Sequence, residues 1–157
     1  MHEVHSGGCL CGEVRFSVTG RPLQVLVCHC NMCQRVTGSA FSVEPVFMKE
    51  QVAVSGQQLA TYSYRSKDHG RILEFSFCRT CGNRLGLTLE RFPAVQVLYA
   101  GTFDQPAWLA PSSHIFTDSA VPWLALPNDV QCFKQHMFNA DGKAAQAVND
   151  VLSSPRP

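Results

Sequence analysis

Seven of the eight cysteines fall into three short groups, and this arrangement constrains the fold more than any other feature of the chain. The groups are Cys9-Leu10-Cys11, Cys28-His29-Cys30-Asn31-Met32-Cys33 and Cys78-Arg79-Thr80-Cys81. Thiolates at such short spacing can converge on one tetrahedral metal ion, about 2.3 Å from each sulfur. The number of thiols that each group supplies therefore decides what kind of metal site it can build.

The two pairs, Cys9 with Cys11 and Cys78 with Cys81, together make a closed set of four ligands. Such a set would tie a glycine-rich N-terminal turn to a knuckle far along the chain, and zinc bound there contributes directly to folding. The alternative is a pair of disulfides or buried free thiols. The spacing, together with an expected reducing compartment, favours zinc.

The triplet Cys28, Cys30 and Cys33 supplies three ligands and leaves one coordination position open. An open position distinguishes a zinc that can meet a substrate from one that only holds a fold. The alternative is a second structural zinc completed by Cys132 or a histidine, and cysteine count alone favours neither. Cys132 lies in an apolar stretch, where a lone cysteine is usually a small core residue. His29 lies between two ligands, so we expect its side chain to point away from their metal, toward the ligands' surroundings or the surface.

Length and charge bound the class of protein. The chain has 157 residues, which fits one domain, and 13 basic against 12 acidic side chains give a net charge of +1. This balance argues against nucleic acid or an anionic membrane as the main partner. We find no apolar run near the roughly 20 residues of a membrane span and no signal-peptide layout at the N-terminus. We therefore expect a cytoplasmic protein with reduced thiols.

Apolar periodicity predicts a mainly β protein. Strands are expected over residues 13–18, 24–27, 39–48, 52–54, 60–66, 71–77, 85–89 and 95–99. The strands over 60–66 and 71–77 read as a hairpin, and one helical turn is expected over 31–37. Residues 102–129 are expected to form an ordered loop region. A short C-terminal helix is expected over 143–152. We expect a single zinc domain over residues 1–140, followed by this helix and a tail over 141–157.

Three further residues are candidates for binding a ligand. His114 and Trp123 lie in the aromatic-rich loop region and could wall a cavity together with Phe41. Arg35, close to the triplet, could hold a carboxylate by a bidentate contact. Each has an ordinary alternative, respectively a packed histidine, a core tryptophan and a surface arginine.

Three motifs resemble the glutathione-dependent formaldehyde-activating (GFA) family, also called the CENP-V/GFA domain. They are Gly-Gly-Cys-Leu-Cys-Gly-Glu-Val-Arg-Phe, Cys-His-Cys-Asn-Met-Cys-Gln-Arg-Val-Thr-Gly-Ser-Ala-Phe and Phe-Cys-Arg-Thr-Cys-Gly. Segments beginning at Ala100 and His114 also look like that family, so the resemblance covers roughly residues 5–133. It implies an Mss4-like fold of several small antiparallel sheets around two Zn²⁺ per chain. A structural zinc would lie on Cys9, Cys11, Cys78 and Cys81, and a site zinc on Cys28, Cys30 and Cys33.

The family activity is the condensation of glutathione with formaldehyde to S-(hydroxymethyl)glutathione, classed as a carbon–sulfur lyase. The resemblance therefore implies a small-molecule thiol and an aldehyde as substrates, with Cys28, Cys30 and Cys33 acting through the site zinc. One departure is Gln34, where the family often has a basic residue, and it puts the preferred thiol in question. The alternative function is a non-catalytic zinc module that binds a protein partner, by analogy with other Mss4-like domains.

Overall fold

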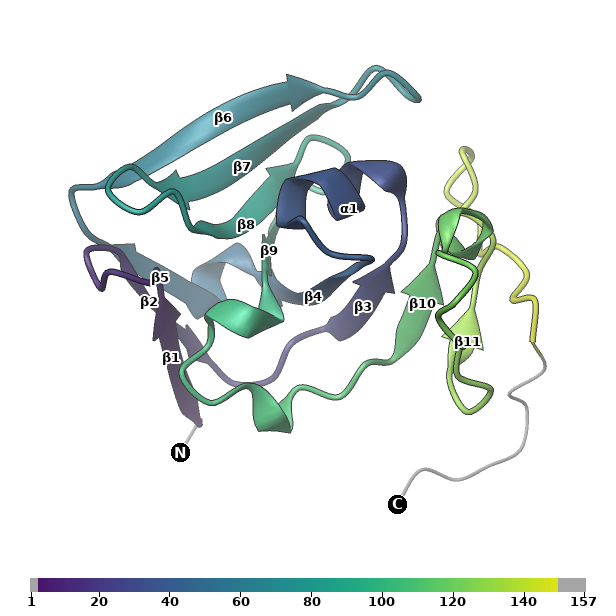
Figure 1. The fold of residues 1–157 in the computed structure, drawn as a ribbon, viewed down its shortest axis with the longest axis horizontal. Helices are drawn as coiled ribbons and strands as arrows, with labels where there is room; N and C mark the ends of the chain where they lie inside the picture. Colours follow the sequence, from purple (N-terminus) through teal and green to yellow (C-terminus); the bar gives the residue numbers. More distant parts are fainter. Residues whose placement is uncertain (1–2, 150–157) are drawn as a thin grey trace. The chain divides into compact units, whose positions relative to one another are not determined.

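The computed structural model describes residues 3–149, which divide into two compact units (Figure 1). Of the described residues, unit 1 comprises 3–24 and Glu44–Leu109, and unit 2 comprises Val25–Val43 and 110–149. The four cysteines of the two pairs all belong to unit 1, and the triplet belongs to unit 2. Each cysteine set is therefore assembled within one unit.

A three-stranded antiparallel sheet carries the first cysteine turn of unit 1. Its strands are β1 (Val4–Gly8), β2 (Arg15–Thr19) and β5 (Val52–Ser55), with β2 in the centre (Figure 1). The alternation predicted over 13–18 is confirmed, because Val14, Phe16 and Val18 are all buried. Strand β1 was not predicted. Its glycine at position 7 lies opposite Phe16, whose ring occupies the space that a side chain on Gly7 would need.

A second antiparallel sheet carries the other cysteine knuckle of unit 1. Its order is the unit 1 part of β4 (Ser42–Met48), then β9 (Val95–Leu98), β8 (Arg84–Leu89), β7 (Ile72–Cys78) and β6 (Leu59–Arg65). The predicted hairpin is confirmed, since β6 and β7 pair from Leu59 with Cys78 to Arg65 with Ile72. Three 3-10 turns complete the unit, namely η1 (Lys49–Gln51), η2 (Ala100–Thr102) and η3 (Pro106–Trp108).

The core of unit 1 includes two of its four clustered cysteines. Its buried side chains are Cys9, Val14, Phe16, Val18, Phe47, Cys78, Leu85, Leu98 and Phe103. Burying one Phe, Leu or Val stabilises a fold by about 1.5–3 kcal/mol. Packing against the apolar core therefore holds Cys9 and Cys78 in position, whatever their sulfur atoms bind.

Unit 2 is built from three short parallel strands and one helix. Strand β10 (Ser113–Ile115) pairs with β3 (Gln24–Cys28) on one side and with β11 (Gln131–Cys132) on the other. The helix α1 (Asn31–Thr37) confirms the predicted turn, and Gly38 ends it with a φ of 68°. Strand β10 lies inside the region predicted as loop, followed by the 3-10 turn η4 (Thr117–Ser119). Three residues are too few for an alternation signal.

The predicted C-terminal helix is wrong over residues 143–149, and residues 150–152 lie outside the described part. The amides of this segment bond to distant carbonyls instead of to their own turn. Ala145 donates to Met137 at 2.8 Å and Val148 donates to Cys132 at 2.8 Å. An isolated helix of this length is marginal in water, so these tertiary hydrogen bonds override its local preference.

The mainly β architecture with several antiparallel sheets is confirmed, although unit 2 pairs its strands in parallel. Within residues 3–149, none of the helices has the length and hydropathy that a membrane span requires. The prediction of one domain over 1–140 with a separate tail stays a prediction.

We predict that Gly86→Ala destabilises the protein by about 1–3 kcal/mol, because the added methyl group overpacks strand β8. A Cβ at this position would meet the carbonyl oxygen of Val97 and lie 2.9 Å from Leu98 Cα, and backbone atoms cannot move aside cheaply. Gly101→Ala is the matched control, since nothing lies within 4 Å of its added Cβ. Urea unfolding of both variants checks this. Equal midpoints for the two would contradict the described packing of β8 against β9.

Candidate metal centres

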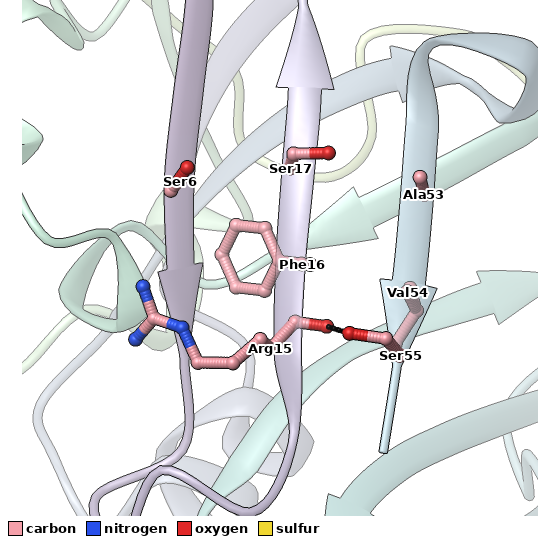
Figure 2. A pocket seen from close by; sticks show the side chains of 7 residues that line it. All are labelled: Ser6, Arg15, Phe16, Ser17, Ala53, Val54 and Ser55. Atoms are coloured by element: carbon pink, nitrogen blue, oxygen red, sulfur yellow. Dashed lines mark hydrogen bonds between the residues drawn. The ribbon is translucent and has the colours of Figure 1, made fainter.

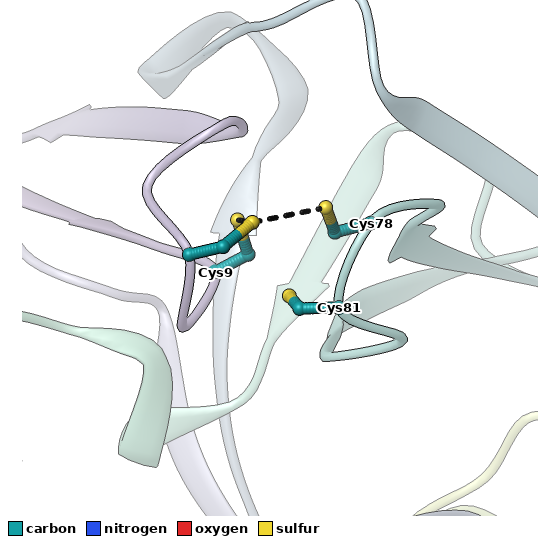
Figure 3. A group of neighbouring side chains, drawn as sticks. Cys9, Cys78 and Cys81 are labelled. Atoms are coloured by element: carbon teal, nitrogen blue, oxygen red, sulfur yellow. Dashed lines mark hydrogen bonds between the residues drawn. The ribbon is translucent and has the colours of Figure 1, made fainter.

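Four sulfur atoms of unit 1 converge as a tetrahedral metal site requires (Figure 3). The sulfur of Cys11 lies 3.5 Å from that of Cys9 and 3.7 Å from that of Cys78. Together with the sulfur of Cys81, all four sulfur atoms lie within 4.8 Å of one another. Tetrahedral zinc with bonds of about 2.3 Å places its sulfurs about 3.8 Å apart, whereas a disulfide bond is about 2.05 Å long. The disulfide alternative does not hold, because all eight cysteines are free thiols. This four-thiol cluster can hold a metal ion.

Two similar turns deliver the four thiols. In the first, Gly12 donates to the carbonyl of Cys9 at 3.1 Å, and in the second, Gly82 donates to the carbonyl of Cys78 at 2.9 Å. Both glycines have positive φ angles, 82° and 71°, which residues with a side chain rarely adopt. The glycine after each cysteine pair thus closes the turn that aims both sulfurs at one point.

Backbone amides favour ionisation in this cluster before any metal binds. The amide of Val14 donates to the Cys9 sulfur at 3.2 Å. The backbone N–H groups of Asn83 and Cys11 lower the pKa of Cys81 to about 6. A thiolate is the form that ligates metal, so the backbone prepares the cluster for a cation.

The triplet forms at the junction of β3 and α1. Strand β3 ends at Cys28, Cys30 caps the helix by accepting a hydrogen bond from the Cys33 amide at 3.3 Å, and Cys33 lies buried in the first turn. The three sulfurs lie within 4.8 Å of one another. Hydrogen bonds from the Cys28 and Cys33 thiols lower the pKa of Cys30 to about 3. This three-thiol cluster can also hold a metal ion.

Among residues 3–149, no fourth histidine, cysteine or carboxylate converges with the three-thiol cluster. The sulfur of Cys132 is buried and lies 3.6 Å from the carbonyl oxygen of Pro127 and 3.7 Å from that of Val130. The alternative in which Cys132 or a histidine completes the site therefore has no support in this arrangement.

The histidine between the ligands is fully buried rather than at the surface. Its Nε2 lies 2.9 Å from Nδ1 of His114, and its ring is 5.8 Å from the ring of Phe41. Burial lowers the pKa of His29. Burial also lowers the pKa of His114; the charge of His29 lowers it further, and the charge of Asp129 raises it in part. The structure thus brings His114 and Phe41 together around His29, the residue between Cys28 and Cys30 in the sequence.

Arg35 and Trp123 are placed differently from His114. Arg35 lies in the last turn of α1 with an exposed side chain, and Trp123 is 75% exposed. An indole so exposed does not close a cavity in this conformation. Their roles in binding a ligand stay predictions.

Sequence reasoning missed the structural role of Gln34. Its side-chain amide donates to the carbonyl of His29 at 2.7 Å and to the carbonyl of Ser119 at 2.9 Å. These two bonds tie the loop that bears the triplet to the segment after β10. Gln34, which stands where a basic residue is common, therefore has a structural role in this chain. No pattern along the sequence indicated its distant partner, Ser119.

A separate hollow of about 280 Å³ lies on the three-stranded sheet of unit 1, and its lining contains none of the clustered cysteines (Figure 2). Arg15 crosses it, paired with Asp104, and Ser55 donates to the carbonyl of Arg15 at 3.5 Å. Since the arginine is already paired and the rest of the lining is serine, alanine, valine and phenylalanine, the hollow offers no group suited to thiol or aldehyde chemistry.

The model of the family described as glutathione-dependent formaldehyde-activating enzyme matches residues 4–119. The chain belongs to this family. The match includes all seven clustered cysteines, together with His29 and His114.

One protein of similar sequence and one solved structure resemble this chain. A Colletotrichum graminicola protein named "Putative glutathione-dependent formaldehyde-activating enzyme" is 25% identical over 122 residues, which cover 70% of this chain. The matched part of the chain spans only 62% of that relative's length. The crystal structure of a Rhodobacter sphaeroides protein superposes with a TM-score of 0.50 at 20% identity, over 63% of this chain and 87% of that one. This second likeness shows a shared fold.

We predict two zinc ions per chain, one for each cluster, in protein purified without chelator. Cys11→Ser and Cys30→Ser should each lose one ion, because each removes a ligand from a different set. Cys132→Ser is the control, since this buried cysteine belongs to neither set. Metal analysis by mass spectrometry measures the ratio. A ratio near zero in folded protein would refute both clusters as metal sites.

We further predict that the two clusters differ in their weight for stability. Cys78→Ser should lower the melting temperature more than Cys30→Ser, because Cys78 lies in the core of unit 1 and its metal would join two distant turns. Cys132→Ser controls for placing a hydroxyl in a buried position. Thermal unfolding followed by circular dichroism compares the three variants. An equal collapse of Cys78→Ser and Cys30→Ser would contradict this division of roles.

Proposed function

We propose that this protein is a zinc-dependent enzyme that acts on a small thiol adduct, joining a thiol such as glutathione to an aldehyde such as formaldehyde. The observation that carries the proposal is the three-thiol cluster, which has no fourth protein ligand among residues 3–149. A closed site serves a fold, whereas a site with three protein ligands leaves room for a reactant. Membership of the family supports glutathione and formaldehyde as the reactants.

The donor set fits zinc better than a harder ion, because thiolates select zinc and other soft metals. Zinc held by Cys28, Cys30 and Cys33 would supply a position at which a substrate thiol loses its proton near neutral pH. The low pKa of Cys30 favours the charged ligand that such a site needs. The four-thiol cluster is proposed to hold the structural zinc of an Mss4-like fold.

The reaction needs little from the chain beyond position and ionisation. The thiolate sulfur forms a bond to the carbonyl carbon, the π electrons of the carbonyl move to its oxygen, and that oxygen takes up the proton that the thiol released. The product is a hydroxymethyl thioether. Cleavage of the same carbon–sulfur bond is the lyase direction. Because the ligands must stay reduced, we place the protein in a reducing compartment, the cytoplasm.

We predict that the zinc-loaded protein accelerates exchange between S-(hydroxymethyl)glutathione and its components above the rate of a protein-free blank. Cys30→Ser should fall to the blank, because it removes a ligand of the proposed site, while Cys132→Ser should keep the activity. Exchange spectroscopy by NMR measures the rate without coupling enzymes. Equal rates for the wild type and Cys30→Ser would reject this activity.

The same samples separate the remaining functions. Calorimetric binding of glutathione without acceleration would favour another carbon–sulfur substrate at the same site. If the protein neither binds glutathione nor accelerates the exchange, the result favours the non-catalytic zinc module, whose partner would then be a protein.

A further inference from the structure

The side-chain amide of Gln34, the residue after Cys33, bonds to two main-chain carbonyls. Its Nε2 donates to the carbonyl of His29 at 2.7 Å and to the carbonyl of Ser119 at 2.9 Å. A carbonyl oxygen only accepts hydrogen bonds, and a side-chain amide nitrogen carries two hydrogens. Both hydrogens are therefore used, and acceptors from two separate segments fix the orientation of the amide.

The main chain of Gln34 makes a third contact, also to the loop that bears the thiols. Its N–H donates to the carbonyl of Cys30 at 3.0 Å. The carbonyls of His29 and Cys30 belong to the two peptide groups on either side of the Cys30 Cα atom. Because a peptide group is planar, the orientations of these two planes set the φ and ψ angles of Cys30, which are −64° and 150°. One residue thus bonds to both planes that determine where the Cys30 side chain points.

The other two cysteines of the three-thiol cluster lie in regular elements. Cys28 is the last residue of β3, which pairs with β10. Cys33 is buried in the first turn of α1, and its carbonyl accepts a hydrogen bond from the Thr37 hydroxyl at 2.8 Å. Cys30 lies between the strand and the helix, as the N-cap of α1. Among the three thiols, the direction of the Cys30 thiol therefore depends most on Gln34.

The distant acceptor is itself anchored outside the cysteine loop. The amide of Ser119 donates to the carbonyl of Phe116 at 3.0 Å within η4. Thr117 donates to the carbonyl of Phe133 through its amide and through its hydroxyl, each at 3.1 Å. Because η4 is held in this way, Gln34 fixes the cysteine loop against a separate element of unit 2.

We propose that Gln34 is a positioning residue that sets the direction of the Cys30 sulfur, and with it the spacing of the three thiols that would hold the metal. Its effect on the reaction rests on the proposed function, whereas its effect on metal binding does not. Removing a group that orients a metal ligand typically lowers metal affinity or activity 10–100-fold.

Substitutions that remove or keep the donors test this inference. Gln34→Met keeps the length of the side chain but removes both hydrogens, and should weaken zinc binding by the three-thiol cluster about 10–100-fold. Gln34→Lys keeps donors that can reach the same carbonyls and should recover most of the loss. Gln51→Met is the matched control in unit 1, because Nε2 of Gln51 also donates to two main-chain carbonyls, those of Thr19 at 2.9 Å and Arg21 at 3.1 Å.

Titration of the zinc-loaded proteins with a chromophoric chelator measures zinc affinity without any activity. The release step that is missing from Cys30→Ser identifies the zinc of the three-thiol cluster. We expect Gln34→Met to release this zinc at a lower chelator concentration and to leave the other step in place, and Gln51→Met to change neither step. An unshifted step in folded Gln34→Met, or an equal shift in Gln51→Met, would overturn the inference.

Melting temperatures show which variants fold. If Gln34→Met does not fold, Gln34→Glu takes its place, since an ionised carboxylate keeps the shape of the amide but cannot donate. Equal zinc affinities of Gln34→Glu and Gln34→Lys would then overturn the inference.

The exchange rate of S-(hydroxymethyl)glutathione, measured with zinc in excess, separates this inference from the proposed function. In an active wild type, Gln34→Met should lower kcat about 10–100-fold with a smaller change in KM, and Gln51→Met should lower neither. An equal kcat in zinc-saturated Gln34→Met would overturn the part of Gln34 in the reaction. A wild type no faster than the blank would overturn the proposed function, while the chelator titration would still decide whether Gln34 positions Cys30. A folded wild type that binds no zinc would overturn both.

Discussion

The interaction on which this structure depends is the close approach of thiol sulfurs that cannot all be charged unless a cation joins them. In the four-thiol cluster the backbone lowers the pKa of Cys81 to about 6. For Cys11 the amide of Glu13 lowers the pKa, but burial and the neighbouring sulfurs outweigh it and raise the pKa to about 12. The Cys81 thiol thus ionises readily while the Cys11 thiol does not, because two negative charges at short range disfavour each other. A divalent cation would remove this conflict and join the turn after β1 to the turn after β7.

The two clusters have different surroundings, and this difference supports the proposed division between a structural and a reactive metal. Cys9 and Cys78 pack among the core side chains of unit 1, between two antiparallel sheets. The triplet instead lies where β3 passes into a seven-residue helix, supported by the side chain of Gln34 and by the paired histidines. A site supported by a few specific hydrogen bonds can keep one coordination position free, whereas the four thiols of the core cluster would fill every position of a tetrahedral ion.

Local patterns predicted what local chemistry determines. The alternation of Val14, Phe16 and Val18, the Gly38 helix end and the convergence of the cysteine groups all follow from residues close together in the sequence, and all are confirmed as structure. What failed depends on distant partners. The segment over 143–149 forms backbone hydrogen bonds to distant residues instead of helical ones. Strand β10 forms because β3 and β11 pair with it on either side. The contact of His29 with His114 joins residues 85 positions apart, so no spacing rule could reveal it. The exposure of Trp123 likewise depends on packing that the aromatic pattern did not contain.

The central claim is that one metal is held by four protein thiolates and the other by three, with a place for a substrate thiol. X-ray absorption at the zinc edge tests it directly, because it counts the sulfur neighbours of zinc. The account predicts an average of about 3.5 sulfurs per zinc in the wild type, from four and three, rising to about 4 when glutathione is added. In Cys132→Ser both values should be unchanged. An average of 4 before any thiol is added, or no rise on adding glutathione, would contradict the account.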